Sequence, residues 1–422
     1  MPRAWAAWPG YKWLVVAALW LACSLNYADR QLIFTVFPLL GGEFALSDSS
    51  LWVVSGSFMW MYALTGPVAG FICDRWSRRI LILGARLFWS LTVAATASAQ
   101  HDWQLVTGIA LTGLVEAFYF PAAISLISDY HGVNTRSRAM SIHQSGVYVG
   151  SIGGGAIAGF VGQYFGWRVG FRLFGAAGGA VSLLLALLLC EPARGLSDAV
   201  KRTPPAGGRV RESLRELAGN GAAWLLIFVF MGANFVAMIL IVWMPTFLYR
   251  KFHMSLSMSG LNGAAYLQIA SILGVMVGGA VADGLVKKRQ GRGYSRMLVQ
   301  SMGLLCGVPF LFLCGWATTI TMVIAAMIGF GFFKGVYDSN IWAALYDIVP
   351  IERRGVSVGL MNSLGWLGGG LAQLCIGFAS LRFGMSVCIS ATAAIYLGIA
   401  AMLFWGARRL AGRRADRKSI SA

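Results

Sequence analysis

The stretch Gly70-Phe-Ile-Cys-Asp74-Arg75-Trp-Ser-Arg78-Arg79 separates two long apolar runs, near residues 51–73 and 80–99, with one acid and three arginines. A helix that crosses a bilayer takes about 20 predominantly apolar residues, and each run reaches that length. Charged side chains are costly in the hydrocarbon core. The stretch is therefore predicted to be a short loop at the membrane surface that joins two spanning helices.

The whole chain has the composition of a membrane protein. Of its 422 residues, 58% are apolar and 12% are charged, and the mean hydropathy is +0.69. A soluble domain is about half apolar and about a quarter charged. The composition excludes a cytosolic enzyme, a disordered protein and a secreted disulfide scaffold. The runs are continuous rather than alternating, which excludes a closed β-barrel. The first run lacks a cleavage site and is predicted to be a retained span.

Twelve apolar runs can span a bilayer, and they form two groups of six. The expected spans lie near residues 13–39, 51–73, 80–99, 103–128, 139–165, 169–190, 222–249, 257–284, 297–315, 318–346, 356–380 and 383–405. The polar segment 191–220, with its Pro-Pro and Gly-Gly pairs, is predicted to be a cytoplasmic linker. The sequence thus predicts an all-α membrane protein of twelve transmembrane helices. Two six-helix bundles, at 1–190 and 221–406, are followed by a basic cytoplasmic tail at 407–422.

The net charge of +18 is an orientation signal on this topology. Most of the 34 basic residues, Arg86 among them, are assigned to the side that holds both termini. Cytoplasmic loops collect Lys and Arg, so both termini are predicted to be cytoplasmic, in a multi-pass protein of the cell (inner) membrane. The same placement accounts for the charge without nucleic acid. Anionic membrane lipids are the expected partner of that surface.

No pattern in the chain indicates a metal, a disulfide or a bound nucleotide. The seven cysteines lie in or at the edges of apolar runs without Cys-x-x-Cys spacing, and the four histidines are scattered. A Gly-x-x-x-x-Gly-Lys-Ser/Thr loop does not occur, so ATP-driven pumping is not expected. We predict a chain without a cofactor, working as a monomer.

The two groups of spans repeat one another in sequence. The matching pairs, all 218 positions apart, are Gly113 and Gly331, Glu116 and Lys334, Tyr119 and Tyr337, and Asp129 and Asp347. Parallel six-helix repeats place a substrate site at the repeat interface, near the bilayer midplane. The sequence therefore predicts the architecture of a transporter.

The loop quoted first resembles the signature Gly-x-x-x-Asp-Arg-x-x-Arg-Arg of the major facilitator superfamily, and a degenerate copy begins at Gly279. The resemblance covers essentially the whole chain and implies transport by alternating access. The glycine lets two helices approach closely. The charges of the loop would pair across helices in one state and separate in the other. The expected cytoplasmic gate comprises Gly70, Asp74, Arg75, Arg78, Arg79, Asp129, Arg138, Asp283, Asp347 and Arg354.

The first and fourth spans resemble two branches of that superfamily, through Asn26-Tyr27-Ala-Asp29-Arg30 and Gly113-Leu-Val-Glu116-Ala-Phe-Tyr-Phe-Pro121. The anion:cation symporters move sugar acids and other organic anions, usually with protons. The Spinster-like transporters include exporters of lipid-like substrates. Gly166-Trp-Arg168 and Trp243-Met-Pro245-Thr-Phe-Leu248 fit the symporter branch better.

One position departs from both branches. They commonly carry an arginine seven residues before the fourth-span glutamate, and this chain has Ile109 there. Lys334, at the equivalent of Glu116 in the second half, is our hypothesis for the replacement cation.

Five charged residues lie inside predicted spans, namely Asp29, Arg30, Glu116, Lys334 and Asp338. A charge at the membrane centre costs at least about 2.5–3.5 kcal/mol, so each needs a partner, a watery cavity or a proton. A carboxyl group that alternates between apolar surroundings and a nearby cation can load and release a proton. Asp29 and Glu116 are therefore the expected proton carriers.

The cations Arg30 and Lys334 are expected to attract a small anionic substrate, because arginine binds carboxylates in a two-point geometry. The other residues predicted to bind substrate are Asn26, Tyr27, Tyr119, Gln144, Tyr148, Asp338 and Asn362. A structural interpretation of the charges stays open as well. Lys334 and Asp338 are four residues apart and can pair within one helix, and Arg30 can serve only to hold Glu116.

The sequence favours a proton-coupled symporter of a small organic anion, such as a sugar acid. A Spinster-like lipid or lysolipid transporter is the alternative. A multipass membrane enzyme would need a nucleophile–base pair or a metal cluster, and the sequence offers neither. A nontransporting receptor with this fold would tolerate the loss of Asp29 and Glu116 in binding assays.

Overall fold

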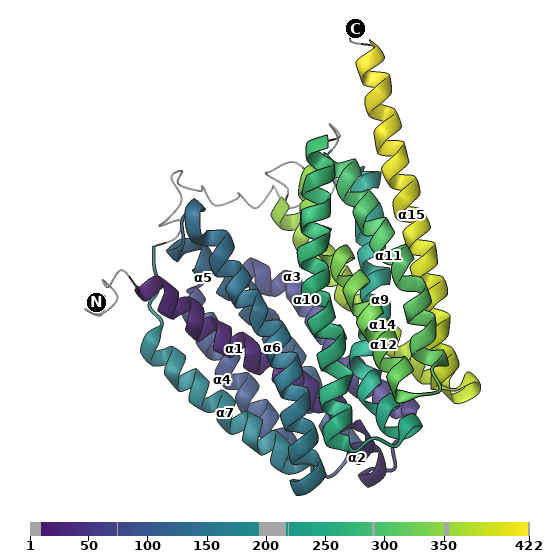
Figure 1. The fold of residues 1–422 in the computed structure, drawn as a ribbon. Coiled ribbons are helices and arrows are strands. Elements are labelled where there is room, and N and C mark those ends of the chain that lie inside the picture. The colour runs from purple at the N-terminus through teal and green to yellow at the C-terminus, as the bar shows by residue number, and fades with distance from the viewer. Residues whose placement is uncertain are drawn as a thin grey trace. The chain divides into compact units, whose positions relative to one another are not determined.

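The computed structural model describes residues 10–73, 75–193, 217, 219–288, 292–349 and 354–420, and the regular elements in them are helices (Figure 1). The first half contains α1 (Tyr11–Thr35), α2 (Phe37–Glu43), α3 (Asp48–Cys73), α4 (Arg78–Thr96), α5 (Asp102–Tyr130), α6 (Val133–Phe165) and α7 (Trp167–Leu188). The second half contains α9 (Gly221–Phe252), α10 (Leu256–Lys288), α11 (Arg292–Trp316), α12 (Ile320–Asp338), α13 (Ile341–Ile348), α14 (Arg354–Phe383) and α15 (Met385–Ile420).

Ten stretches within the described helices are long and apolar enough to cross a membrane. They correspond to ten of the twelve expected spans, and α12 and α13 together form one of them. The other two expected spans coincide with α1 and α3, which do not reach the same hydropathy. The helix α1 carries Asp29 and Arg30 in its second half, and α3 is interrupted by serines, glycines, aromatic residues and Pro67.

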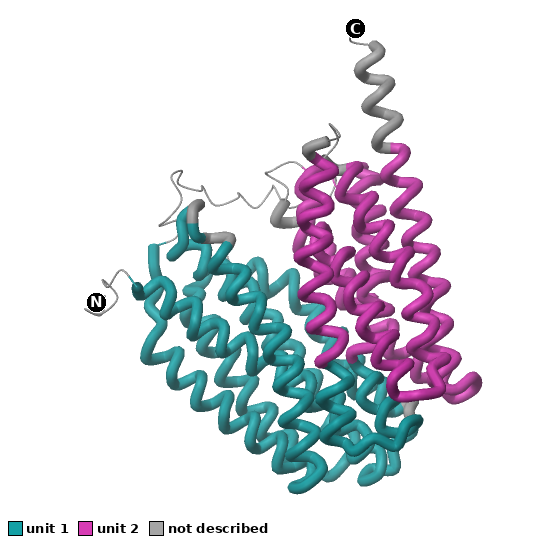
Figure 2. Tube along the Cα trace, viewed as in Figure 1, with its two compact units in different colours: residues 1–205, 242–264 teal, residues 206–241, 265–422 magenta. Residues whose placement is uncertain are grey.

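The chain divides into two compact units (Figure 2). Unit 1 comprises Met1–Pro205 and Val242–Ala264, and unit 2 comprises Ala206–Ile241 and Ala265–Ala422. The C-terminal part of α9 and the beginning of α10 therefore belong to the same unit as the first half of the chain. Most of the predicted linker, residues 194–216 and 218, lies outside the described residues.

Helix packing in unit 1 depends on small residues. The helix α1 packs mainly on α6, α3 packs on α5, and α4 packs on both α5 and α7. A Cβ atom at Gly150 of α6 would overlap with the carbonyl oxygen of Ser24, and one at Gly154 would overlap with Ala28. Both neighbours lie on α1, so these glycines allow the two backbones to touch, as small residues do between membrane helices.

Equivalent helix crossings in the two units show the same kind of packing. A Cβ atom at Gly113 of α5 would overlap with the carbonyl oxygen of Phe58 on α3, and one at Gly331 of α12 would crowd the carbonyl oxygen of Leu267 on α10. The Ser271 hydroxyl donates a hydrogen bond to the Gly331 carbonyl oxygen at 2.9 Å. The 218-residue sequence repeat is thus matched by equivalent helix crossings in the two units.

Candidate functional site

An ion pair between α1 and α5 forms the centre of the polar site in unit 1. Arg30 Nε donates to Glu116 Oε2 at 2.8 Å, and the Arg30 terminal amino group contacts Glu116 Oε1. The two residues are 7% and 3% exposed. The guanidinium and the carboxylate therefore face one another in the two-point geometry that makes this pair strong.

Aromatic rings surround the Arg30 guanidinium. Its carbon atom lies 4.3 Å from the ring centre of Tyr27, 4.9 Å from that of Phe58 and 5.8 Å from that of Tyr62. Phe58 and Tyr62 are buried, whereas Tyr27 is half-buried. Ring faces stabilise a cation in the absence of water.

A second buried ion pair lies beside the first. Arg86 of α4 places its Nη1 atom 3.5 Å from Asp29 Oδ2, and the same nitrogen donates to Asn26 Oδ1. Arg86 is 1% exposed and Asp29 is 2% exposed. The assignment of Arg86 to the basic membrane surface is therefore wrong. Its position near the start of an apolar run resembles that of a loop charge, but its partners lie on α1, inside the bundle.

Tyr119 connects α5 to two further helices. Its hydroxyl donates to the Leu19 carbonyl oxygen of α1 at 2.8 Å and lies 3.4 Å from His143 Nε2 of α6. Both side chains are buried. Gln144 is exposed and Tyr148 is half-buried on the same helix, α6. Of the predicted binding residues in unit 1, the structure brings Asn26, Tyr27 and Tyr119 close to the charged pairs.

Unit 2 contains the third charged pair of the interior. Lys334 Nζ contacts Asp338 Oδ2, one helical turn along α12, and both residues are half-buried. The intrahelical pairing that the sequence spacing allows is therefore present. Asn362 of α14 is half-buried as well.

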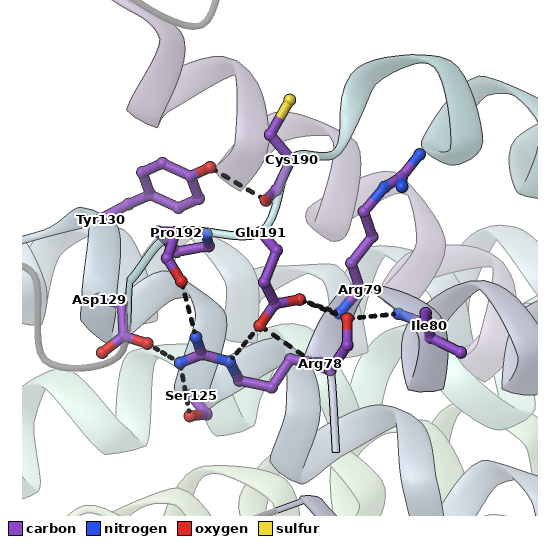
Figure 3. A network of polar contacts seen from close by, with 10 residues as sticks. Arg78, Arg79, Ile80, Ser125, Asp129, Tyr130, Cys190, Glu191 and Pro192 are labelled. Atoms are coloured by element: carbon purple, nitrogen blue, oxygen red, sulfur yellow. Dashed lines mark hydrogen bonds and ion pairs between the residues drawn. The ribbon is translucent and has the colours of Figure 1, made fainter. Parts of the chain in front are cut away.

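A second polar network lies at the start of α4 (Figure 3). Arg78, only 2% exposed, lies between Asp129 at the end of α5 and Glu191, which follows α7. Its Nε atom donates to Glu191 Oε1 at 2.9 Å, and its Nη2 atom donates to the Pro192 carbonyl oxygen at 3.2 Å. The structure thus joins two predicted gate residues, Arg78 and Asp129, and adds Glu191.

Glu191 also caps α4. Its carboxylate accepts hydrogen bonds from the Ser77 hydroxyl at 2.8 Å and from the Arg79 backbone amide at 2.7 Å. Partial burial favours the neutral acid, but these bonds and the Arg78 guanidinium hold the pKa of Glu191 below its ordinary value. Glu191 is not among the residues predicted from the sequence. A signal existed, because Glu191 is the first charge after the sixth apolar run.

Tyrosines hold the chain in place just before Glu191. The Tyr11 hydroxyl donates to the Leu188 carbonyl oxygen at 2.8 Å and accepts from the Cys190 amide at 2.9 Å. The Tyr130 hydroxyl donates to the Cys190 carbonyl oxygen at 3.0 Å, as Figure 3 shows. The ends of α1, α5 and α7 are therefore tied together next to the Arg78 network.

Unit 2 contains an equivalent of the Arg78–Asp129 pair. Arg296 Nε of α11 lies 3.4 Å from Asp347 Oδ2, and Arg296 Nη2 lies 3.9 Å from Asp283 Oδ1. Arg296 follows Arg78 by the same 218 positions that separate Asp347 from Asp129. The sequence repeat could have identified Arg296 as a gate residue, but Arg296 is not among the predicted gate residues.

The remaining predicted gate residues have separate surroundings. Arg75 is exposed and donates to the Phe71 carbonyl oxygen at 3.2 Å, and Arg79 Nη2 donates to the Ala186 carbonyl oxygen at 3.0 Å. Arg138 is exposed, with its guanidinium 5.6 Å from the Trp13 ring centre. Gly70 is half-buried near the end of α3. Asp74 and the side chain of Arg354 lie outside the described residues.

The opposite end of unit 1 is fastened by Glu43, at the end of α2. Its carboxylate accepts a 2.6 Å hydrogen bond from Trp167 Nε1 and pairs with Arg168, whose Nη2 donates to the Ala99 carbonyl oxygen at 2.7 Å. Desolvation opposes ionisation, but the bonds from Trp167 and Arg168 hold the pKa of Glu43 below its ordinary value. The Gly-Trp-Arg motif noted in the sequence therefore joins the α6–α7 turn to α2 and to the end of α4.

Comparison with known proteins identifies the family. The model of the Major Facilitator Superfamily matches residues 19–373. Human protein spinster homolog 1 is 30% identical over 82% of this chain and 68% of its own length. The D-galactonate transporter of Escherichia coli O6:H1 is 24% identical over 94% of this chain and 95% of its own length.

A solved structure shares the fold. The crystal structure of a bacterial homolog of the human lysosomal transporter Spinster, described as inward-facing and unoccupied, has a TM-score of 0.83 and 23% sequence identity. The match covers 95% of this chain and 98% of that one. This likeness concerns the fold, whereas the family match and the human relative establish that the chain belongs to the Major Facilitator Superfamily and is a multi-pass membrane transporter, not an enzyme.

Proposed function

We propose that the protein is a secondary active transporter that moves a small organic anion, such as a sugar acid or another carboxylate, together with protons. The observation that carries this proposal is the buried, two-point pair of Arg30 and Glu116. A guanidinium that holds one carboxylate in this way offers the same geometry to the carboxylate of a substrate. The D-galactonate transporter among the relatives supports the substrate class.

The charge balance of the interior supports proton coupling. Arg30, Arg86 and Lys334 each lie against a carboxylate. An anion that binds Arg30 must displace Glu116, and an unpaired carboxylate is costly inside the bundle. Protonation of Glu116 removes that cost and releases Arg30 for the substrate. Loss of the proton on the other side would restore the pair and expel the anion.

The proposal includes the topology that this mechanism needs. We assign α1 and α3 to the membrane as well, which gives twelve spans with both termini in the cytoplasm of an inner-membrane protein. Residues 1–190 and 221–406 would be the two bundles that alternate in access, joined by the linker 191–220. The networks at Arg78 and Arg296 would belong to the cytoplasmic gate, together with the signature loop.

A second candidate is transport of a lipid or lysolipid. Human protein spinster homolog 1 supports it, because its sequence is 30% identical to this chain, compared with 24% for the D-galactonate transporter. The same ion pair would then bind a charged headgroup, and the proton-coupling role of Glu116 would be unchanged. The two candidates differ in whether the substrate carries acyl chains.

Ligand-induced stabilisation of the purified protein separates these candidates. Unfolding temperatures would be measured at two pH values with D-galactonate, with a neutral sugar of the same size and with a lysophospholipid. The anion proposal expects stabilisation by D-galactonate or a related sugar acid, lost in Arg30→Gln. Stabilisation by the lysophospholipid alone would favour the lipid candidate, and stabilisation only by neutral sugars would contradict the anion proposal.

A further inference from the structure

Adjacent residues of α1 point to different helices. Arg30 faces Glu116 on α5, whereas Asp29 faces Arg86 on α4. Successive side chains of an α-helix are about 100° apart around its axis, since a turn takes 3.6 residues. Two neighbouring charges can therefore have two separate partners, and α1 takes part in two separate ion pairs rather than in a single cluster.

Arg86 is enclosed within the bundle. Its side chain is 0% exposed, and a Cβ atom at Gly178 of α7 would lie 3.1 Å from its Nη2 atom. Its Nη1 atom engages Asn26 and Asp29, whereas Nε and Nη2 are buried without a hydrogen-bond partner among the described residues. The guanidinium is buried against Asp29 and Gly178, so any role of Arg86 in transport is exerted through Asp29.

The groups around Asp29 leave Arg86 as its counter-ion. On α1 itself, Arg30 is engaged by Glu116, and Cys23 and Asn26 are neutral. On α4, Arg86 is accompanied by Trp89, whose ring centre lies 5.7 Å from the guanidinium. The other helices of the bundle carry the buried polar residues Glu116 and Tyr119 on α5, His143 on α6 and Ser182 on α7.

We infer that Arg86 is a positioning residue for Asp29, a buried counter-ion that sets the pH range in which Asp29 exchanges its proton, separately from Arg30 and Glu116. The inference rests on the proposed function, in which Asp29 carries a proton. With Asp29 ionised, the Asp29–Arg86 pair has no net charge and the two side chains stay in contact. When Asp29 takes up a proton, Arg86 keeps its hydrogen bond to Asn26 and remains in place, ready to receive the carboxylate again.

Infrared titration of the protein in liposomes tests this without a substrate. The carbonyl-stretch band of a protonated carboxyl group reports each acid, and the band that Asp29→Asn removes belongs to Asp29. Removal of an adjacent opposite charge changes the titration of a carboxyl group by about 1–3 pH units. We expect Arg86→Gln to move the midpoint of the Asp29 band upward by that amount, whereas Arg86→Lys, which keeps the charge, leaves it near its original value.

The outcomes separate the inference from the proposed function. An Asp29 band that titrates at the same pH in Arg86→Gln as in the parent protein would overturn the inference and leave the proton carrier intact. Absence of any titrating Asp29 band in the parent would overturn both. An equal displacement in Glu116→Gln would also overturn the inference, because the two carboxyl groups would then titrate together.

A second variant covers a failure of Arg86→Gln to fold. Asn26→Leu removes the acceptor that holds Arg86 Nη1 but keeps every charge. A smaller upward movement of the Asp29 midpoint is expected, because the guanidinium is then less firmly directed at Asp29. No movement in Asn26→Leu, with Arg86→Gln unfolded, would contradict the positioning role.

Discussion

Glu116 is the residue whose charge the proposed mechanism needs most directly. In Glu116→Gln the amide can still accept a hydrogen bond from Arg30, but it cannot bind or release a proton. We expect uptake driven by a pH gradient to fall to background while exchange of substrate across the membrane persists. The two activities would be measured in proteoliposomes with a radiolabelled substrate identified by thermal stabilisation.

Asp102→Asn is the matched control for this prediction. Asp102 is exposed in the first turn of the same helix, far along the sequence from the ion pair. Its neutralisation should change neither activity. Gradient-driven uptake that survives in Glu116→Gln would rule out this carboxyl group as a proton carrier.

Glu191 should contribute to stability in a pH-dependent way. Its pKa lies below the ordinary value in the folded protein, so its contribution is complete above the usual glutamate range near 4.3 and is lost as the pH falls through the lowered pKa. We expect Glu191→Gln to lose on the order of 1 kcal/mol at neutral pH, after allowance for solvent screening. Thermal unfolding at pH 7 and in acid would show a difference that narrows on acidification, whereas a pH-independent difference would contradict the assignment.

The sequence predicted one of the two ion pairs that α1 makes, as a hypothesis about individual residues. Arg30 and Glu116 stood out because both interrupt long apolar runs. Asp29 stood out for the same reason, but its partner did not, since Arg86 lies only a few residues beyond a basic loop. Pairing between helices that are distant in sequence depends on how each helix is rotated, and a single sequence does not specify that rotation. Pairing within a helix, as in Lys334–Asp338, follows directly from spacing.

At the scale of elements, one glycine of α6 should be far less replaceable than its neighbour. A Cβ atom at Gly155 would overlap with the carbonyl oxygen of Gly260, on the part of α10 that belongs to unit 1, whereas a Cβ atom at Gly153 has open space. We expect Gly155→Ala to destabilise the protein by about 1–3 kcal/mol through overpacking. Gly153→Ala should be neutral or slightly stabilising, because alanine favours helix. Equal unfolding temperatures for the two variants would contradict this helix crossing.

The helices themselves followed well from the apolar runs, and the differences have physical causes. The expected first span is divided into two helices, α1 and α2, by a break at Val36, just before Pro38. The expected tenth span is divided at Ser339 and Asn340 into α12 and α13. Hydropathy detects how long a run remains apolar, but it does not detect a local break in the backbone hydrogen bonds. The contact of Glu43 with Trp167 and Arg168 could likewise not be predicted from the sequence, since it joins residues more than 100 positions apart.

At the scale of the whole molecule, the two equivalent arginines should differ in importance. Arg78 is 2% exposed and engages two carboxylates, whereas the Arg296 side chain is 21% exposed. Removing one partner of a buried pair costs about 3–5 kcal/mol, and a screened pair near the surface contributes about 1 kcal/mol or less. Arg78→Gln should therefore lower the unfolding temperature more than Arg296→Gln. Partial recovery in Arg78→Gln/Asp129→Asn would confirm that an unpaired carboxylate is the cause.

The orientation of the molecule gives a further prediction. With both termini in the cytoplasm, a fluorescent protein fused after Ala422 should mature and fluoresce, whereas alkaline phosphatase fused at the same position should be inactive. A fusion truncated after Gly166, between the fifth and sixth expected spans, should show the reverse pattern. Active phosphatase at the C-terminal fusion would contradict the proposed topology, in which an even number of spans places both termini in the cytoplasm.

The opposite charges at Glu116 and Lys334 have a consequence for how such a protein can be encoded. These residues occupy equivalent positions of the repeat, 218 residues apart. A symmetric dimer built from one gene of half this length would carry the same residue at both positions, either two acids or two bases. When the two halves are joined in one reading frame, each half can acquire its own charge at this position. The fused gene therefore permits an asymmetry, a carboxylate in one half and a cation in the other, that no homodimer of either half can encode.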